Sequence, residues 1–289
     1  MPSVDVIVAV RNEEQNLPIF VERLFALPFP SDVDVKVVFV EDSSTDGTHD
    51  VLRRLAGADP RVGYYILARG YGQGPAIVFG LSRSSADAMI MMDADGGHPL
   101  EVLPEMVRHY LDGARVVQCV RNTLANRKAY RDIGAATFEL FARSLTGVDT
   151  HEQNIFFRLV TADVAREILR QPRYWRWLRF PLPRRAGELR KISVDSRERV
   201  FGQSNYDFHR LVNLAVDGIL SLIPAVRFAV ILGLLVLAAS MLVRKGSWVL
   251  ALLVGGGVIW LINRYLQLQR GEILQQMQVV ECANVRGAA

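Results

Sequence analysis

Acidic side chains follow directly after an apolar run (AMIMM), and their spacing suits the binding of a metal ion. Asp93 and Asp95 flank Ala94 in this segment. On an extended backbone, side chains at i and i+2 project to the same side, and two like charges repel unless a cation lies beside them. Mg²⁺ and Mn²⁺ prefer oxygen ligands and combine a few protein carboxylates with phosphate oxygens. The pair therefore predicts a divalent cation that bridges a diphosphate. His98 is a further ligand candidate, although its place before Pro99 equally suits a turn.

Two other apolar runs also end in polar residues. Residues 4–10 (VDVIVAV) are followed by 11–14 (RNEE), and residues 35–40 (VKVVFV) are followed by 41–48 (EDSSTDGT), which contains Asp42. In open α/β sheets, ligands bind beyond the carboxyl ends of the strands. These three strand ends are therefore the places where we expect chemistry.

The elements that must position these residues form an alternating pattern over residues 1–120. Short β-branched runs alternate with segments of helical periodicity, which predicts an α/β fold with a mainly parallel sheet. The expected strands are 4–10, 35–40, 62–67 and 88–92, and the expected helices are 16–27, 48–57 and 74–85.

The composition excludes several classes of protein. The chain has 289 residues, of which 50% are apolar and 22% are charged. These values exclude a disordered chain, a collagen and a small disulfide scaffold. The two cysteines, Cys119 and Cys282, match no metal-ligand or redox spacing, which favours a reducing compartment.

The charge is unevenly distributed along the chain. The overall net charge is +4, yet residues 170–199 carry ten Lys or Arg residues against three acidic ones. A basic segment of this kind can bind nucleic acid. The apolar C-terminal quarter favours a membrane instead, so we expect no nucleic-acid partner.

Two uncharged runs, 228–243 and 247–262, predict a pair of apolar helices. Sixteen helical residues reach roughly 24 Å, against about 30 Å for a bilayer core. We expect a transmembrane hairpin over 223–268, with a re-entrant hairpin and a buried helix pair as the alternatives. The basic excess before the hairpin predicts that residues 1–219 are cytoplasmic. Residues 206–222 suit an interfacial amphipathic helix or a simple connector.

The motifs together resemble glycosyltransferase family 2, of GT-A fold, and within it the polyprenyl-phosphate sugar synthases. This group includes dolichyl-phosphate mannose synthase and bacterial undecaprenyl-phosphate glycosyltransferases. The segments that carry the resemblance are 8–18 (VAVRNEEQNLP), 40–48 (VEDSSTDGT), 72–80, 92–101 (MDADGGHPLE) and 199–206 (RVFGQSNY). The resemblance implies a Rossmann-like GT-A catalytic domain over 1–205, followed by the interfacial helix, the hairpin and a cytoplasmic tail over 269–289.

The family's functional residues can be carried over position by position. The resemblance implies that the nucleotide and ribose of the donor are bound by Ala9, Arg11, Glu13, Val40, Asp42, Asp93 and Ala94. It further implies that Asp95, with Asp93, binds Mg²⁺ or Mn²⁺, and that the catalytic group comprises Asp93, Asp95, Arg121, Arg131 and Arg199. Arg121 and Arg131 would lie near the acceptor phosphate, and Arg199 would close over the donor.

The implied reaction is metal-dependent, inverting transfer of a sugar from a UDP- or GDP-sugar to a polyprenyl phosphate. The implied protein is an integral membrane enzyme with a cytoplasmic catalytic domain, in a bacterial inner membrane. A hydroxyl acceptor on a glycolipid or polysaccharide and a non-catalytic nucleotide-sugar-binding partner are the alternatives. The sugar, the base and the oligomeric state stay open, a homo-oligomer included.

Overall fold

The structure is a computed structural model, and it describes residues 1–94, 97–121, 157–170, 189–194, 225–244, 247–269 and 277–286. The chain divides into two compact units. The first unit comprises Met1–Arg127, Glu152–Gln203 and Glu272–Ala289, and the second comprises Lys128–His151 and Ser204–Gly271. The first unit holds all the described strands.

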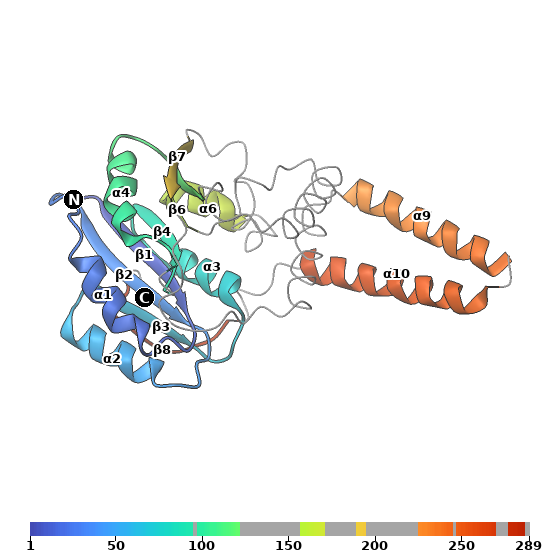
Figure 1. The fold of residues 1–289 in the computed structure, drawn as a ribbon, viewed down its shortest axis with the longest axis horizontal. Helices are drawn as coiled ribbons and strands as arrows, with labels where there is room; N and C mark the ends of the chain where they lie inside the picture. Colours follow the sequence, from blue (N-terminus) through green and yellow to red (C-terminus); the bar gives the residue numbers. More distant parts are fainter. Residues whose placement is uncertain are drawn as a thin grey trace. The chain divides into compact units, whose positions relative to one another are not determined.

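The described part of the first unit is built around an eight-stranded sheet of order β7-β5-β6-β4-β1-β2-β3-β8 (Figure 1). Strands β4, β1, β2 and β3 are parallel, whereas β6 and β8 run antiparallel to their neighbours. The strands are β1 Ser3–Val10, β2 Asp34–Glu41, β3 Val62–Leu67, β4 Ala88–Asp93, β5 Val116–Arg121, β6 Arg158–Thr161, β7 Leu189–Val194 and β8 Val279–Ala283. The predicted α/β fold with a mainly parallel sheet is confirmed.

Helices cover both faces of this sheet. One core cluster packs α1, α2 and α4 against the strands, and the other packs α3 and α6 against the opposite face. The bounds are α1 Asn16–Phe25, α2 Thr48–Ala58, α3 Gln73–Arg83, the 3₁₀ helix η1 Leu100–Val102, α4 Leu103–Leu111 and α6 Ala162–Arg170.

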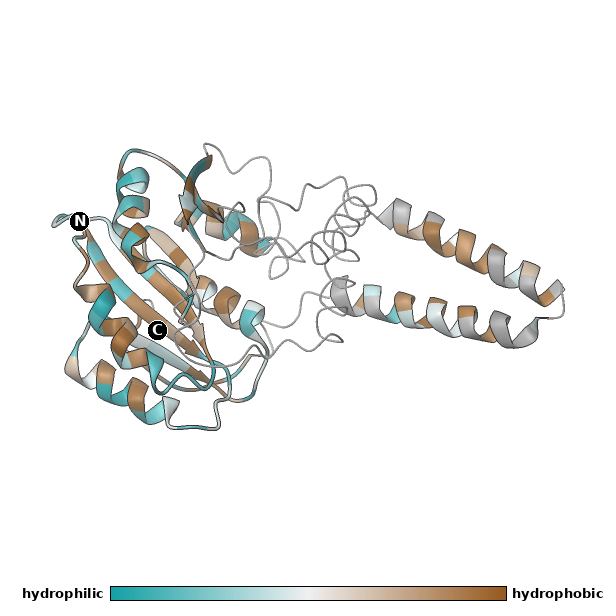
Figure 2. Cartoon of the chain, in the orientation of Figure 1, coloured by the Kyte–Doolittle hydropathy of each residue, from teal (hydrophilic) through white to brown (hydrophobic). Residues whose placement is uncertain are grey.

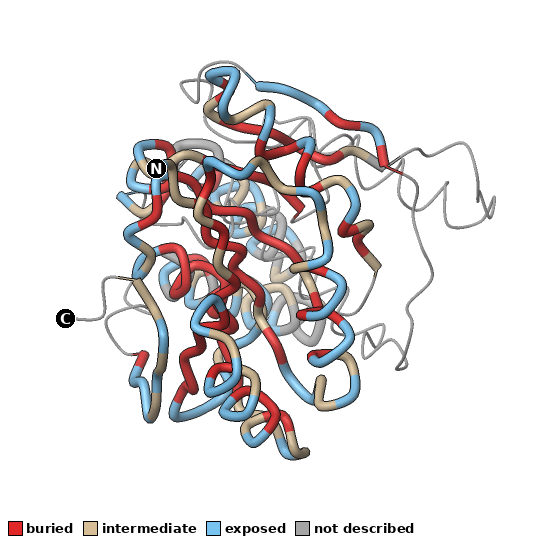
Figure 3. The backbone as a smooth tube through the Cα atoms, turned by 90° about the vertical axis from the view of Figure 1, so that its left-hand side faces the viewer, coloured by how far each residue is buried: buried red, intermediate tan, exposed pale blue. Residues whose placement is uncertain are grey.

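The central strands are buried along nearly their whole length (Figure 3). A sheet covered by helices on both sides requires apolar residues at successive positions rather than at alternate ones. This is the reason why the runs 4–10, 35–40, 62–67 and 88–92 appear in the sequence as largely apolar segments, with Asp5 and Lys36 as the charged exceptions.

The last strand, β8, lies within residues 269–289, which were expected to be a cytoplasmic tail. It pairs antiparallel with β3 at the edge of the sheet. Glu281 of β8 accepts hydrogen bonds from Arg53 of α2 at 2.6 to 3.1 Å. Arg286, just beyond β8, lies 3.0 Å from the buried carboxylate of Asp5 in β1. The C-terminal segment is therefore part of the fold of the first unit.

The described part of the second unit is a pair of helices, α9 Ala225–Arg244 and α10 Trp248–Gln269. Apolar residues run along both helices (Figure 2). The rings of Phe228 and Tyr265 stack with centroids 3.9 Å apart and tie the two helices together. Several large apolar side chains are exposed: Leu234, Val236, Leu237, Met241, Leu252, Ile259, Trp260 and Leu266.

The helical pair spans 225–269, which nearly coincides with the hairpin predicted over 223–268. In the portion of the chain that the structure describes, no helix has both the length and the apolar character needed to cross a membrane. The transmembrane crossing is therefore not confirmed. The expected interfacial helix over 206–222 lies outside the described residues.

Candidate functional site

Three of the predicted site residues lie side by side at the carboxyl edge of the sheet. Ala9 of β1 is in register with Asp93 of β4 on one side and with Val40 of β2 on the other. Parallel strands bring their carboxyl ends to a common edge, so this row places the acidic end of β4 beside the polar ends of β1 and β2. Ala94 follows Asp93 and is buried.

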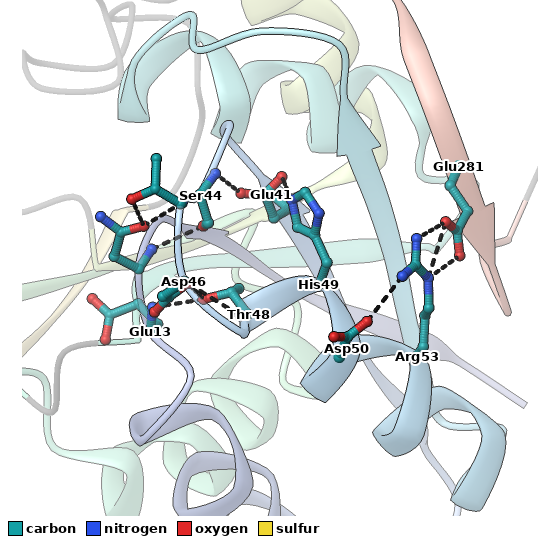
Figure 4. Close-up of polar contacts among 11 residues, drawn as sticks. Glu13, Glu41, Ser44, Asp46, Thr48, His49, Asp50, Arg53 and Glu281 are labelled. Atoms are coloured by element: carbon teal, nitrogen blue, oxygen red, sulfur yellow. Dashed lines mark hydrogen bonds and ion pairs between the residues drawn. The ribbon is translucent and has the colours of Figure 1, made fainter.

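The loop after β1 and the loop after β2 are joined by hydrogen bonds (Figure 4). The Glu13 amide donates to Thr48 Oγ1 at 2.9 Å, and the Gly47 amide donates to Glu14 Oε2 at 2.8 Å. Asp46 accepts bonds from the Glu14 amide at 3.3 Å and from the Thr48 amide at 3.1 Å. The two loops therefore hold each other in one arrangement beside the row of strand ends.

Hydrogen bonding also keeps Asp46 in its charged form. Partial burial raises the pKa of this carboxyl, but the bonds from Thr48 and the backbone amides outweigh burial and leave the pKa below its ordinary value. Asp46 is therefore a carboxylate at neutral pH, and it adds negative charge to the edge. An acidic edge of this kind accepts cations more readily than bare anions.

Asp42, which is buried, holds a third loop in place. Its Oδ1 accepts the Tyr71 amide at 2.6 Å, and its Oδ2 accepts the Gly72 amide at 2.8 Å. Gly72 has a φ of +95° and immediately precedes α3. Asp42 thus fixes the loop between β3 and α3 at the same edge. The sequence prediction placed Asp42 in the nucleotide site but gave no sign of this loop contact.

Glu41, the last residue of β2, is fully buried and also contacts a loop. Its Oε2 lies 2.7 Å from Nε2 of His49 on α2, and its Oε1 accepts the Ser44 amide (Figure 4). Neither Glu41 nor His49 was predicted. The signal that could have found them is an acidic residue that ends an apolar strand, followed eight positions later by a histidine in the first turn of a helix.

Asp93 is partly exposed and is held by two neighbours. Gln73 of α3 donates to its Oδ1, and His98 Nε2 lies 3.3 Å from its Oδ2. The His98 ring packs on Phe157 with centroids 4.9 Å apart. Gln73 was not predicted, although its place at the start of a helix on the same sheet face was the available signal. His98 contacts a candidate metal ligand through its ring nitrogen.

Arg121 ends β5 at the same edge as Asp93. Gln118, Arg158 and Met91 occupy one row across β5, β6 and β4. Arg121 lies three residues beyond Gln118, and Asp93 lies two residues beyond Met91, in strands of the same direction. Only the backbone of Arg121 is described. Asp95, Arg131 and Arg199 lie outside the described residues, so their predicted roles stay predictions.

Arg158 is buried in that row, which the sequence did not indicate. Its side chain is 1% exposed, and burial lowers its pKa to about 10. The row places it on the sheet face that packs against α3 and α6. The guanidinium of Arg158 places a positive charge on the strand next to β4, near the acidic end of that strand.

The side-chain oxygen atoms at this edge supply some, but not all, of the ligands that a hard divalent cation needs. Among the residues that the structure describes, no group of three or more His, Cys, Asp or Glu side chains could hold a metal ion. Asp93 contributes one carboxylate, 24% exposed, at the end of β4. Magnesium needs only one or two protein carboxylates when phosphate oxygens complete its coordination. The chemistry of this carboxylate therefore fits such an ion.

Comparisons with known proteins show the family to which the chain belongs. The family model for glycosyl transferase family 2 matches residues 5–179. The chain is 30% identical over 251 residues to the bactoprenol glucosyl transferase of Shigella phage SfV, covering 86% of this chain and 80% of that protein. It is 30% identical over 219 residues to the undecaprenyl-phosphate 4-deoxy-4-formamido-L-arabinose transferase of Pectobacterium atrosepticum, covering 74% of this chain and 66% of that protein.

Solved structures show the same fold. Glucosyl-3-phosphoglycerate synthase from Mycobacterium tuberculosis, in complex with Mn²⁺, UDP-glucose and phosphoglyceric acid, superposes with a TM-score of 0.51 at 16% identity. The match covers 76% of this chain and 78% of that one. The family model covers more than half of this chain. The chain therefore belongs to glycosyl transferase family 2 and is a glycosyltransferase.

Proposed function

We propose that this enzyme transfers a sugar from a nucleotide sugar to a polyprenyl phosphate at a membrane surface. The observation that carries the proposal is the row of Asp93, Ala9 and Val40 at the carboxyl edge, flanked by the interlocked polar loops. The names of the relatives support the acceptor, because two of them act on bactoprenol or undecaprenyl phosphate.

The donor would bind along this edge. The base and ribose would lie at the ends of β1 and β2, where Ala9 and Val40 are in register and are followed by Arg11, Glu13 and Asp42. The Arg11 guanidinium lies beside Gly70, 3.6 Å from where a Cβ of that glycine would stand. A Cβ at position 70 would make an ordinary van der Waals contact with this guanidinium, which places Arg11 next to the loop before α3.

A divalent cation, Mg²⁺ or Mn²⁺, would bind at Asp93 and Asp95. When bound, such an ion neutralises the diphosphate of the donor and stabilises the charge that develops on the leaving nucleoside diphosphate. The Mycobacterium tuberculosis neighbour was solved with Mn²⁺ and UDP-glucose, which supports the choice of ion. Gln73 and His98 would hold Asp93 in the orientation that this role requires.

The acceptor phosphate needs cations rather than a base. A polyprenyl phosphate is already an anionic nucleophile at neutral pH, so no proton has to be removed from it. Repulsion between the acceptor and the donor diphosphate is the main obstacle, and it grows in a dry site. Arg121, Arg131 and Arg199 would offset that repulsion, since guanidinium groups pair bidentately with phosphate. We propose that the acceptor phosphate displaces the nucleoside diphosphate directly, with inversion at the anomeric carbon.

The helices α9 and α10 would attach the enzyme to the bilayer that holds its acceptor. Their exposed leucine, valine and tryptophan side chains are the apolar surface that lipid would cover. We propose that the hairpin crosses the membrane and that the catalytic unit is cytoplasmic, because the basic excess precedes the hairpin. In a variant whose exposed Cys282 is replaced by serine, labelling a cysteine placed at Ser247, between the helices, from each side of oriented vesicles would test the crossing.

Mass spectrometry of the reaction products tests the proposed function. Purified protein is incubated with undecaprenyl phosphate, Mn²⁺ or Mg²⁺ and a panel of UDP- and GDP-sugars, and the lipid fraction is analysed. We expect the mass of undecaprenyl phosphate plus one sugar, and its loss on Asp95→Asn or in EDTA. Asp32→Asn, an exposed carboxylate outside the site, is the matched control and should keep full activity.

Three outcomes would contradict the proposal. A product on a hydroxyl lipid and none on the phosphate would reassign the acceptor. Tight nucleotide-sugar binding without turnover would indicate a non-catalytic partner. Full activity of Asp95→Asn in EDTA would exclude the role of the metal.

A further inference from the structure

Two non-glycine residues at the candidate site have left-handed backbone conformations. Asn12 has a φ of +57° in the loop after β1, and Ser43 has a φ of +63° in the loop after β2. Such conformations are unfavourable for most residues and persist only where the surrounding structure imposes them. Of the described non-glycine residues with positive φ, two of the three thus lie at this edge, on adjacent loops.

Asn12 bonds to the second loop through both its backbone and its side chain. Its amide donates to Ser44 Oγ at 2.9 Å, and its Oδ1 accepts the Thr45 amide at 2.8 Å. These partners are the first and second residues after Ser43, the other left-handed residue. The two unusual conformations are therefore linked by a reciprocal pair of hydrogen bonds.

We propose that Asn12 is a positioning residue for the nucleotide donor, an inference that rests on the function proposed above. Its sequence neighbours, Arg11 and Glu13, are expected to contact the nucleotide, and Asp42 begins the loop that Asn12 holds. Asn12 sets the relative position of these groups before the donor arrives. It does so through the loop and makes no contact with the reacting atoms.

Asparagine combines two properties that this position needs. Asn tolerates the left-handed region better than other residues with a Cβ, and its short side chain reaches a nearby amide. Glycine would keep the conformation but lose the acceptor for the Thr45 amide. Aspartate would keep both the acceptor and much of the conformational tolerance.

The chain offers a matched control away from the carboxyl ends of the strands, beside the amino end of β3. Asn284, just after β8, also has a left-handed backbone, with a φ of +53°. Its Nδ2 donates to the carbonyl oxygens of Ala56 at 2.7 Å and Val62 at 3.1 Å. Asn284→Gly therefore removes side-chain hydrogen bonds from the same residue type in the same conformation, away from the site.

The experiment compares Asn12→Gly, Asn12→Asp and Asn284→Gly in the full-length protein. Calorimetry measures the binding of UDP and of GDP, each with Mn²⁺. Hydrogen exchange measures protection of the peptide over 42–48, and thermal scans measure stability. For Asn12→Gly we expect about tenfold weaker nucleotide binding and faster exchange over 42–48. Asn12→Asp should restore the protection, and Asn284→Gly should lower the melting temperature while changing the dissociation constant less than about twofold.

Each other outcome overturns the inference in a distinct way. Unchanged binding in Asn12→Gly would show that the loop needs no such restraint. Equal weakening in Asn284→Gly would show that lost stability, rather than positioning, lowers affinity. If the unaltered protein binds neither nucleotide, the proposed function fails, and the inference fails with it.

Discussion

Replacing Asp42 with asparagine should loosen the loop between β3 and α3. The two oxygens of this buried carboxylate accept the amides of Tyr71 and Gly72 at 2.6 and 2.8 Å. An asparagine side chain has only one acceptor oxygen, so its NH₂ group would face one of these amides donor to donor. The substitution also removes the charge that strengthens the remaining bond.

The size of the effect follows from these two bonds. A hydrogen bond to a charged group contributes about 1.5–3 kcal/mol, and a buried donor left without an acceptor costs about 1–3 kcal/mol. Both bonds are only partly buried, so water can reach the displaced amide. We therefore expect Asp42→Asn to lower the free energy of unfolding by about 2.5 kcal/mol, the lower end of the sum of these two ranges.

Urea unfolding of the full-length protein in detergent, followed by circular dichroism, measures this change. Asp32→Asn is the control, because Asp32 is exposed and the substitution is chemically the same. Its free energy of unfolding should stay within about 0.5 kcal/mol of the unaltered protein, as for most surface changes. A loss below about 0.5 kcal/mol in Asp42→Asn as well would refute the idea that this carboxylate holds the loop.

Three further predictions concern the C-terminal strand and the cysteines. Hydrogen bonds from Arg53 lower the pKa of Glu281 to about 2, so the unfolded chain binds more protons than the folded one as the pH falls from about 4.5 toward 2. Stability should therefore decrease across that range, and acid titration of Glu281→Gln should show a shallower decrease; an identical slope would contradict the contact. Deleting residues 277–289 should cost the catalytic unit its cooperative thermal transition, and an unchanged melting curve would show that β8 is dispensable. Burial raises the pKa of Cys119 to about 12, whereas Cys282 is exposed, so iodoacetamide at pH 8 should modify Cys282 alone in the native protein, and rapid modification of both would contradict this packing.

The central sheet could be predicted from the sequence because its strands are buried on both faces. Such strands need apolar residues at successive positions, so the runs around Val8, Val38 and Met91 stood out without any knowledge of their partners. The parallel direction of these strands then brought Asp93 and Ala9 to one edge. For Asp93 this followed from local patterns and the rule for strand ends, whereas Ala9 was expected there only from the family resemblance.

The remaining elements depend on contacts between distant parts of the chain. Strand β6 lies between β4 and β5 although it follows both in sequence, and β8 reaches the other edge from the end of the chain. Nothing in the sequence around Arg158 indicates that it is buried, yet β6 places it in the core. The left-handed conformation of Asn12 is set by the neighbouring loop, and no pattern within 11–14 reveals it.

The measurement that tests the account most directly is a hydrogen-exchange footprint of the donor. Exchange of the full-length protein is compared with and without Mn²⁺ and the nucleotide sugar that supports turnover. Slower exchange is predicted in peptides covering 9–14, 40–48 and 92–98, with little change around Asn284 at the opposite edge. Protection confined to that opposite edge, or none at the strand ends while the donor is bound, would contradict the claim that the carboxyl edge of this sheet binds the nucleotide sugar.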